Sequence, residues 1–194
     1  MTDLITLDEY KEAQSISSAT NDVRTEALID SVSQLVKTYC GNSIVDYYTT
    51  PKVEVQTVEW ATSLIQLDQS PINSIVTVEE RADMGSSYVT LDSTEYYLDT
   101  STDIVIRSNG TTQAYWATGP GSVRVTYTAG YEYTPADLRL AVIDLVTYYL
   151  KDEHKQHLSL GSAAMGNQGS SSQDKNVGFP DHIKRVLDFY KQIL

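Results

Sequence analysis

The sequence predicts an α+β fold in which a helical bundle carries an inserted antiparallel β region. Apolar residues recur at helical spacing in segments 21–40, 135–157 and 179–194. Between the first two segments, residues 42–131 contain short runs in which apolar and polar side chains alternate, the pattern of half-buried strands. We therefore expect N-terminal helices, a long helix after Pro135 and a C-terminal helix to form the bundle.

Two helices are predicted before the β region. Thr6 and Glu9 have the spacing of a capping box, in which each side chain accepts a hydrogen bond from the other residue's backbone amide, so a helix is expected over 7–16. A second helix is expected over 21–40, ending before Gly41. Its apolar side is formed by Ala27, Leu28, Val32, Leu35, Val36 and Tyr39. An amphipathic helix of this kind must pack on another element.

The β region over 42–131 is predicted from alternation and from turns. Val53 and Val55 alternate with Glu54 in one of several such runs. The pair Asn-Gly at 109–110 supplies the positive φ angles of a tight hairpin turn. Several short strands joined by turns of this kind predict an antiparallel sheet or a small sandwich.

The last strand of this region is expected to lead directly into the long helix. Gly130 lets the chain bend at the end of the strand. Thr134 is the expected N-cap, and Pro135 suits the first position of a helix over 135–157.

The helix over 135–157 is apolar on more than one side. One stripe is formed by Leu138, Ala141, Val142, Leu145 and Tyr149. The residues that widen this stripe are Ile143, Val146 and Leu150. Such a helix needs a second cover, which is either the helix over 21–40 or a neighbouring subunit. We therefore treat the three widening residues as candidates for packing between subunits.

The C-terminal part is predicted to be a helix on a tether. Residues 158–178 are rich in Gly, Ser, Asn and Gln, which predicts a flexible linker after a core over 1–157. The helix over 179–194 has Pro180 at its start. Its candidate partner-binding residues are Phe179, Ile183, Val186, Leu187, Tyr190 and Leu194. This apolar side suits docking onto a partner and suits packing on the chain's own domain equally well.

Composition limits the classes of function. The formal net charge is −12, from 26 acidic and 14 basic residues, and acidic residues dominate the β region. Because such a surface repels phosphate, tight binding of DNA or RNA is not expected. The single cysteine, Cys40, leaves no disulfide framework and favours an intracellular protein. The start of the chain lacks the pattern of a signal peptide, and no apolar run is long enough to span a membrane.

No catalytic, cofactor-binding or metal site is predicted. His154 and His157 are spaced to share a metal ion, but the remaining histidine, His182, lies beyond the linker, and a metal site needs further ligands. Cys40 lies in the last turn of a predicted helix, where the helix dipole disfavours a thiolate. The glycine spacings match neither phosphate-binding nor dinucleotide-binding loops. We therefore expect a protein that is not an enzyme and has no cofactor.

Several stretches, taken in order, resemble one protein family. They are ITLDEYKEA, YCGNSI at the end of the second helix, SPINSIVTV, VRVTYTAGY, TPADLRLAVIDLVTYYL and FPDHIKRVLDFYKQIL. In their order and spacing they resemble the head–tail connector proteins of tailed bacteriophages, also called adaptor or head completion proteins. The resemblance extends from Ile5 to Leu194, and its strongest part is the junction between the last strand and the helix that follows it.

The resemblance implies a structural role in a virion. It implies a ring of about twelve copies beneath the portal, at the neck between head and tail, assembled in the host cytoplasm. The ring would extend the channel through which DNA passes, and would join the portal protein to a stopper or tail protein. In these terms residues 1–157 are the adaptor core and residues 179–194 the docking helix, with no membrane partner.

Two other classes of function remain as alternatives. The first is a monomeric binding module whose β region grips a peptide or carbohydrate through aromatic side chains, namely Tyr47, Tyr48, Tyr88, Tyr96, Tyr97, Tyr115 and Trp116. The second is a metal-dependent enzyme that uses His154 and His157. The structural adaptor is the preferred hypothesis.

Overall fold

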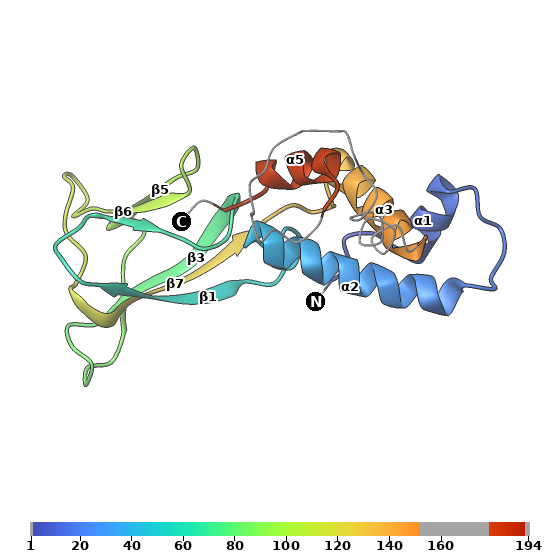
Figure 1. Cartoon of the computed structure of the whole chain (residues 1–194). Coiled ribbons are helices and arrows are strands. Elements are labelled where there is room, and N and C mark those ends of the chain that lie inside the picture. The colour runs from blue at the N-terminus through green and yellow to red at the C-terminus, as the bar shows by residue number, and fades with distance from the viewer. Residues whose placement is uncertain (1, 152–178, 193–194) are drawn as a thin grey trace, which may run out of the picture. The chain divides into compact units, whose positions relative to one another are not determined.

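The computed structural model describes residues 2–151 and 179–192, and the chain divides into two compact units (Figure 1). The helical unit comprises Met1–Cys40 and Thr134–Lys191. The β unit comprises Gly41–Tyr133 and Gln192–Leu194. The chain therefore leaves the helical unit after Cys40 and returns to it at Thr134. The predicted linker over 158–178 lies outside the described residues.

The predicted fold class, a helical bundle with an inserted β region, is wrong. The described residues form four helices and seven strands, and the strands make two antiparallel sheets. Buried residues from both sheets form a hydrophobic core that belongs to the β unit alone. Because two packed sheets cover each other's apolar faces, these strands need no helix to bury them. The sheets therefore form a compact unit with its own core, and they are not a region carried by a helical bundle.

The helical unit begins with α1 (Leu7–Ala13), which has the predicted capping box. The amide of Glu9 donates to the Thr6 hydroxyl at 3.2 Å, and the amide of Thr6 donates to the Glu9 carboxylate at 2.7 Å. The helix ends at Ala13 rather than at residue 16, because Ser15 adopts a positive φ of 54° that a right-handed helix cannot continue. The next helix, α2, spans Asp22–Cys40.

Helix α3 (Ala136–Leu150) follows the last strand, and residues 152–157 of the predicted helix lie outside the described residues. Its N-cap is Pro135 and not Thr134, whose hydroxyl instead donates to the carbonyl of Leu4 at 2.6 Å. Helix α5 (Asp181–Phe189) is the last helix. Helix α3 contacts both α2 and α5, so the chain itself covers more than one side of this apolar helix.

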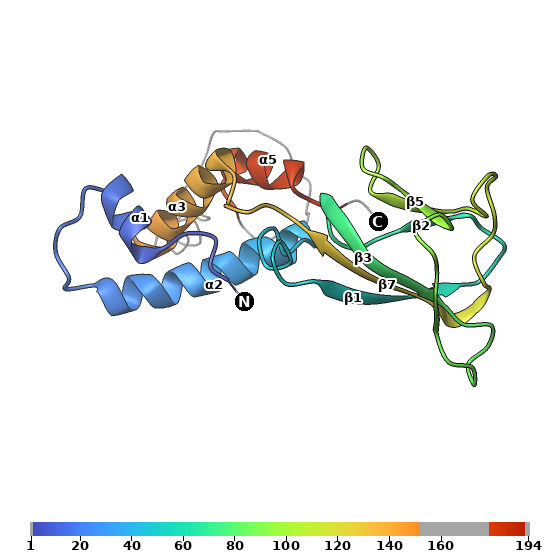
Figure 2. The ribbon, with the colours of Figure 1, turned by 180° about the vertical axis from the view of Figure 1, so that it is seen from behind.

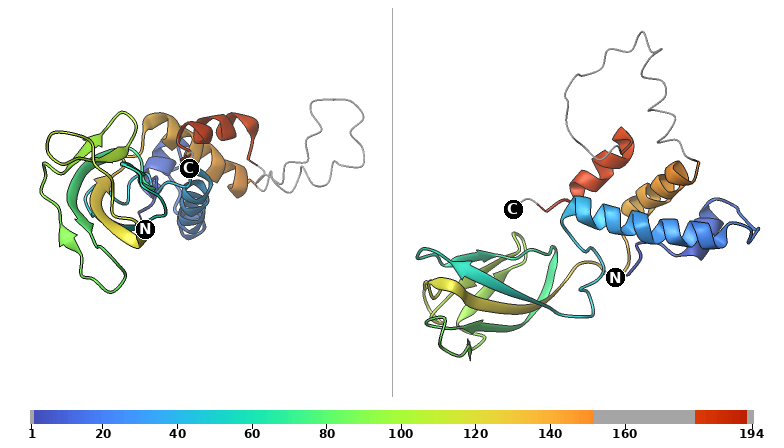
Figure 3. Two further views of the ribbon diagram at one scale, coloured as in Figure 1. Left: turned by 90° about the vertical axis from the view of Figure 1, so that its left-hand side faces the viewer. Right: turned by 60° about the horizontal axis from the view of Figure 1, so that its bottom comes forward.

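The β unit contains a four-stranded and a three-stranded sheet, seen from behind in Figure 2 and from two further sides in Figure 3. The larger sheet has the order β1-β7-β3-β4, formed by Lys52–Val58, Gly119–Ala129, Ile72–Glu80 and Val89–Thr90. The smaller sheet has the order β2-β6-β5, formed by Leu64–Gln66, Ile104–Arg107 and Tyr96–Asp99. All pairings are antiparallel. The longest strand, β7, lies between β1 and β3 and supplies four residues to the core.

The bend after β7 requires a glycine. Gly130 has a φ of +92°, and a β-carbon at this position would lie 2.2 Å from the carbonyl oxygen of Ile44. The amide of Tyr131 donates to this same carbonyl at 2.7 Å, and the Gly130 amide donates to the carbonyl of Pro71 at 2.8 Å. The junction is therefore pinned to the loop that precedes β1, and only a residue without a side chain fits there.

Strand β1 turns its polar residues inward. The carboxylate of Glu54, 6% exposed, accepts hydrogen bonds from the Tyr127 hydroxyl at 2.6 Å and from the backbone amide of Asp68 at 3.2 Å. The Lys52 ammonium lies 3.2 Å from the same carboxylate, and the Gln56 side-chain amide also donates to it. A buried carboxylate is tolerated only when it is paired and hydrogen-bonded in this way.

The valines of the same strand consequently face solvent. Val53 is 58% exposed and Val55 is 54% exposed. Full burial of a valine contributes about 1.5 kcal/mol or more, so both side chains forgo much of that stabilisation in the isolated chain. The stability of the isolated chain therefore does not explain why two apolar side chains of this strand are exposed.

Candidate protein-binding surfaces

The predicted partner-binding residues of the C-terminal helix face the interior of the helical unit. Ile183 is 1% exposed and Leu187 is fully buried, and Phe179 is buried as well. Val186 and Tyr190 are half-buried, and Leu194 lies outside the described residues. The structure thus brings the apolar residues of α5 together against the chain's own helices. Their binding to a partner remains a prediction.

Polar contacts hold α5 in this position. The Tyr39 hydroxyl of α2 donates to Asp188 at 2.6 Å, and the Tyr190 hydroxyl donates to Asp137 of α3 at 2.6 Å. The hydrogen bond from Tyr190 lowers the pKa of Asp137, because it favours the carboxylate. Desolvation, followed by the hydrogen bond to Asp188, raises the pKa of Tyr39 to about 12. Tyr39 is therefore a protonated donor at neutral pH.

Cys40 lies beneath α5 and is chemically protected. It is fully buried, and its thiol donates to the carbonyl of Leu187 at 3.6 Å. Burial raises the pKa of the thiol to about 12, so very little thiolate exists at neutral pH. The rim of the same contact is aromatic, because the rings of Tyr39 and Phe179 meet edge to face with centroids 5.1 Å apart. The cysteine serves packing in this position.

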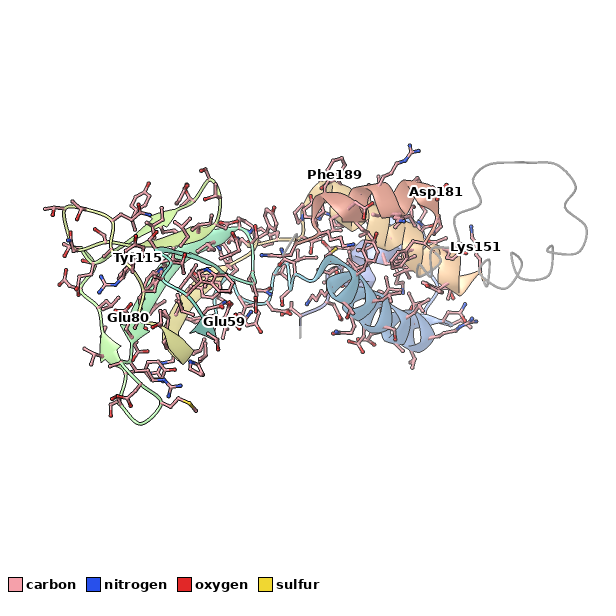
Figure 4. All side chains as sticks on the ribbon, turned by 60° about the vertical axis from the view of Figure 1, so that its left-hand side comes forward. Glu59, Glu80, Tyr115, Lys151, Asp181 and Phe189 are labelled. Carbon is pink, nitrogen blue, oxygen red and sulfur yellow. The ribbon has the colours of Figure 1, made fainter. Side chains whose placement is uncertain are left out.

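The outer side of α5 combines charged side chains of both signs with one exposed aromatic ring. Phe189 is 85% exposed (Figure 4), and the exposed charged or polar residues of the same helix and its end are Asp181, His182, Arg185, Asp188 and Lys191. Helical spacing excluded Phe189 from the apolar stripe, so the sequence reasoning missed it. The sequence did contain a signal for it, because Phe189 is an aromatic residue on the charged side of an amphipathic helix. Aromatic and arginine side chains are enriched at the centres of protein interfaces.

The predicted subunit-packing residues of α3 also lie largely inside the helical unit. Val146 is fully buried, Ile143 is buried, and Leu150 is half-buried. The remaining surface of Ile143 lines an open cavity of about 220 Å³ between α1 and α3. Arg139 and Glu9 also line this cavity, and their side chains pair at 3.2 Å. Contact of the three predicted residues with a neighbouring copy remains a prediction.

The aromatic residues of the alternative binding module lie in different environments. Trp116 is in the core of the β unit, where its indole N–H donates to the carbonyl of Ser63 at 2.9 Å. Tyr88 is held between Arg81 and Arg124, whose guanidinium carbons lie 5.0 and 4.2 Å from the ring centroid. The others are half-buried or exposed on several segments: Tyr47, Tyr48, Tyr96, Tyr97 and Tyr115.

Within residues 2–151 and 179–192, no group of three or more His, Cys, Asp or Glu side chains is placed to hold a metal ion. The predicted pair His154 and His157 lies outside this part of the chain. In the same part, no helix has both the length and the apolar character needed to cross a bilayer.

The helices pack into one unit and the two sheets pack into another, and both units leave side chains exposed that can pack against other proteins. These features define a class of protein that works through its packing surfaces. The family model for the head completion proteins matches residues 3–193, which is nearly the whole chain. The chain therefore belongs to the head completion protein family, and the resemblance found in the sequence is confirmed. Members of this family are structural proteins of virions. Among curated proteins, none matches the chain.

Solved structures with a similar fold come from gene transfer agent (GTA) particles. A chain from the neck of an empty GTA particle, computed with C6 symmetry, is 11% identical with a TM-score of 0.60, covering 98% of this chain and 91% of that chain. A chain from the neck of the native particle, computed with C12 symmetry, is also 11% identical with a TM-score of 0.60, covering 100% and 95%. A chain from the native virion is 14% identical, with a TM-score of 0.60 and coverages of 98% and 91%. These likenesses extend over both units.

Proposed function

We propose that this chain is the structural adaptor of a phage neck. Copies of it form a ring beneath the portal, extend the DNA channel, and join the head to a stopper or tail protein. The observation that carries the proposal is the match of residues 3–193 to the head completion family. The fold supports it, because similar chains belong to particle necks computed with C12 and C6 symmetry.

The outer side of α5 is the surface that we propose binds the portal. Use of the buried side would require Ile183 and Leu187 to leave the helical unit, since both are essentially unexposed. Exposing each of them costs about 1.5–3 kcal/mol before any contact with the partner is gained. The exposed Phe189 and Arg185 can bind without this cost. The energetic comparison therefore favours the outer side.

The charge of the chain supports a channel through which DNA moves without being held. The net charge of −12 repels phosphate groups, so contacts with a passing duplex are weak. Cations are comparatively frequent on the last helix and its end, where Lys184, Arg185 and Lys191 lie within eight residues. Asp181 and Asp188 partly balance these cations, so this end of the chain is close to neutral and repels an acidic partner less than the rest of the chain does.

The portal contact is tested with a charge-introducing substitution at the exposed ring. We expect Phe189→Asp to abolish co-sedimentation of the full chain with portal oligomers, because it places a carboxylate in the centre of the contact. The matched control is Val23→Asp on α2, which is 84% exposed in the same unit and should bind normally. Full binding by Phe189→Asp would exclude the outer side of α5. A wild-type chain that ignores the portal altogether would refute the adaptor role.

A further inference from the structure

Strand β1 keeps its apolar side chains outside against the pattern of its neighbours. Val53 pairs with Thr126 of β7, whereas Glu54 pairs with Val125, which is part of the core. A shift of one residue in this pairing would exchange the two faces and bury both exposed valines. The network around Glu54 opposes that shift, because it satisfies the carboxylate only in the observed register. The outward position of Val53 and Val55 is therefore built into the β unit.

The valines belong to a wider face of the four-stranded sheet. Directly paired residues of an antiparallel sheet share a face, so the pairings of β1, β7 and β3 define its members. We call this the valine face, formed by Val53, Val55, Ser74, Thr77, Thr126 and Thr128. The hydroxyls of Ser74 and Thr128 bond to each other at 2.8 Å, so part of their polarity is already satisfied within the chain.

The strand residues on the side of the valine face carry no net charge, although the chain is strongly acidic. Among the described residues of β1, β3 and β7, the charged side chains on this side are Arg124 and Glu79, which pair with each other. Two nitrogen–oxygen contacts of 2.6 and 2.7 Å join them. The Arg124 guanidinium also covers the Tyr88 ring at 4.2 Å. Two copies of a chain with a net charge of −12 repel each other least where the contacting strand residues carry no net charge.

The three-stranded sheet has a second apolar face on the other side of the core. Ile65 and Val105 of this sheet point into the core, so their neighbours along the strands point away from it. One outward row of paired residues is Leu64, Ile106 and Tyr97, and the other, which is more polar, is Gln66, Ile104 and Asp99. Tyr115 precedes the buried Trp116 and is 71% exposed, at the end of the same sheet. We call Leu64, Tyr97, Ile106 and Tyr115 the tyrosine face.

We propose that the valine face of one copy packs against the tyrosine face of the next copy. This inference rests on the proposed ring and names the surfaces that build it. In a closed ring each copy must present two different, complementary surfaces, and the β unit has two outer faces with exposed apolar side chains on opposite sides of one core. Aromatic and β-branched side chains pair well across packed sheets. The ring then continues the sheet-on-sheet packing of each β unit into its neighbours.

The pairing of the two faces is tested by cross-linking between introduced cysteines in the full chain. Val55→Cys and Tyr97→Cys are made singly and together, and oligomers are treated with a bis-maleimide that spans about 10 Å, the spacing of packed sheets. The native thiol gives little background, because Cys40 is the single cysteine and is buried. We expect a ladder of linked copies from the double variant, linked pairs from a mixture of the two single variants, and none from either single variant alone.

A charge substitution provides a second readout. Val55→Lys should prevent oligomer formation in sedimentation experiments, whereas Val89→Lys should not. Val89 is an exposed valine of the same sheet, but it pairs with Glu80 and lies outside the valine face. Both variants change the net charge equally, so the comparison isolates the position.

The outcomes separate this inference from the proposed function. Oligomers that persist in Val55→Lys, or that give no ladder in the double variant, overturn the pairing of faces and leave the ring intact. Linked pairs from Val55→Cys alone also overturn it, because they mean that the valine face meets itself. A wild-type chain that forms no oligomer, either in solution or on the portal, overturns the proposed ring and this inference together.

Discussion

Removal of one buried hydroxyl tests how the β unit keeps a carboxylate in its interior. Tyr127 is fully buried, and its hydroxyl donates to Glu54 at 2.6 Å while accepting from the amide of Gln69 at 3.3 Å. Burial raises the pKa of Tyr127, so the hydroxyl remains a donor at all ordinary pH values. Tyr127→Phe keeps the ring and deletes only these two hydrogen bonds.

The expected loss of stability follows from the partners that remain. A hydrogen bond to a charged group contributes about 1.5–3 kcal/mol, and the weaker one from Gln69 adds less than about 1 kcal/mol. The Glu54 carboxylate still has the Lys52 ammonium and the Asp68 amide. Tyr127→Phe should therefore lower the free energy of unfolding of the β unit by about 2–3 kcal/mol. This loss is smaller than the roughly 3–5 kcal/mol expected when a buried charge loses its partner.

Urea unfolding followed by tryptophan fluorescence measures this change selectively. Both tryptophans, Trp60 and Trp116, lie in the β unit, and Trp116 is buried in its core. Tyr97→Phe is the matched control, because this tyrosine is 62% exposed and should shift stability by less than about 0.5 kcal/mol. If Tyr127→Phe unfolds together with this control, the Glu54 network does not hold the register of β1, and the outward position of Val53 and Val55 is not built into the β unit.

Two further substitutions test the helical unit and the junction after β7. Leu187→Ala should destabilise the docking of α5 by about 2–5 kcal/mol, since Leu187 is fully buried. Labelling of Cys40 by a thiol reagent should then accelerate by at least about 25-fold, because every 1.4 kcal/mol corresponds to a factor of about ten. Gly130→Ala should prevent native folding of the β unit, since the new β-carbon would lie 2.2 Å from the Ile44 carbonyl oxygen; loss of the cooperative fluorescence transition measures it.

Each of these substitutions has a control of its own. Arg185→Ala alters an exposed residue of α5 and should leave the labelling rate of Cys40 unchanged; equal rates in Leu187→Ala and wild type would mean that α5 does not shield the thiol. Gly110→Ala shares a positive φ of 91° but meets nothing within 4 Å, so it should fold with a modest loss. Equal stabilities of Gly130→Ala and Gly110→Ala would refute the close approach of Ile44.

Local sequence signals predicted local structure well. The Thr6–Glu9 capping box is present as expected, because both partners lie within one turn and need no distant residue. The predicted fold class was wrong. Whether a sheet or a helix covers a given apolar face depends on which segments meet in the folded chain. Residues such as Val78, Val105 and Val125 close a core between two sheets, and no local pattern reports that they are neighbours.

The sequence by itself determined the family, the periodicity of the elements and the overall charge of −12. It did not determine which side of an element faces inward. Alternation in β1 shows that Val53 and Glu54 point to opposite sides, but Tyr127, 73 positions further along the chain, draws the carboxylate into the core. Helical spacing in α5 likewise defined an apolar side, while α2 and α3 determined that Leu187 would be covered within the chain. Such decisions depend on contacts between distant segments, so only the tertiary structure could make them.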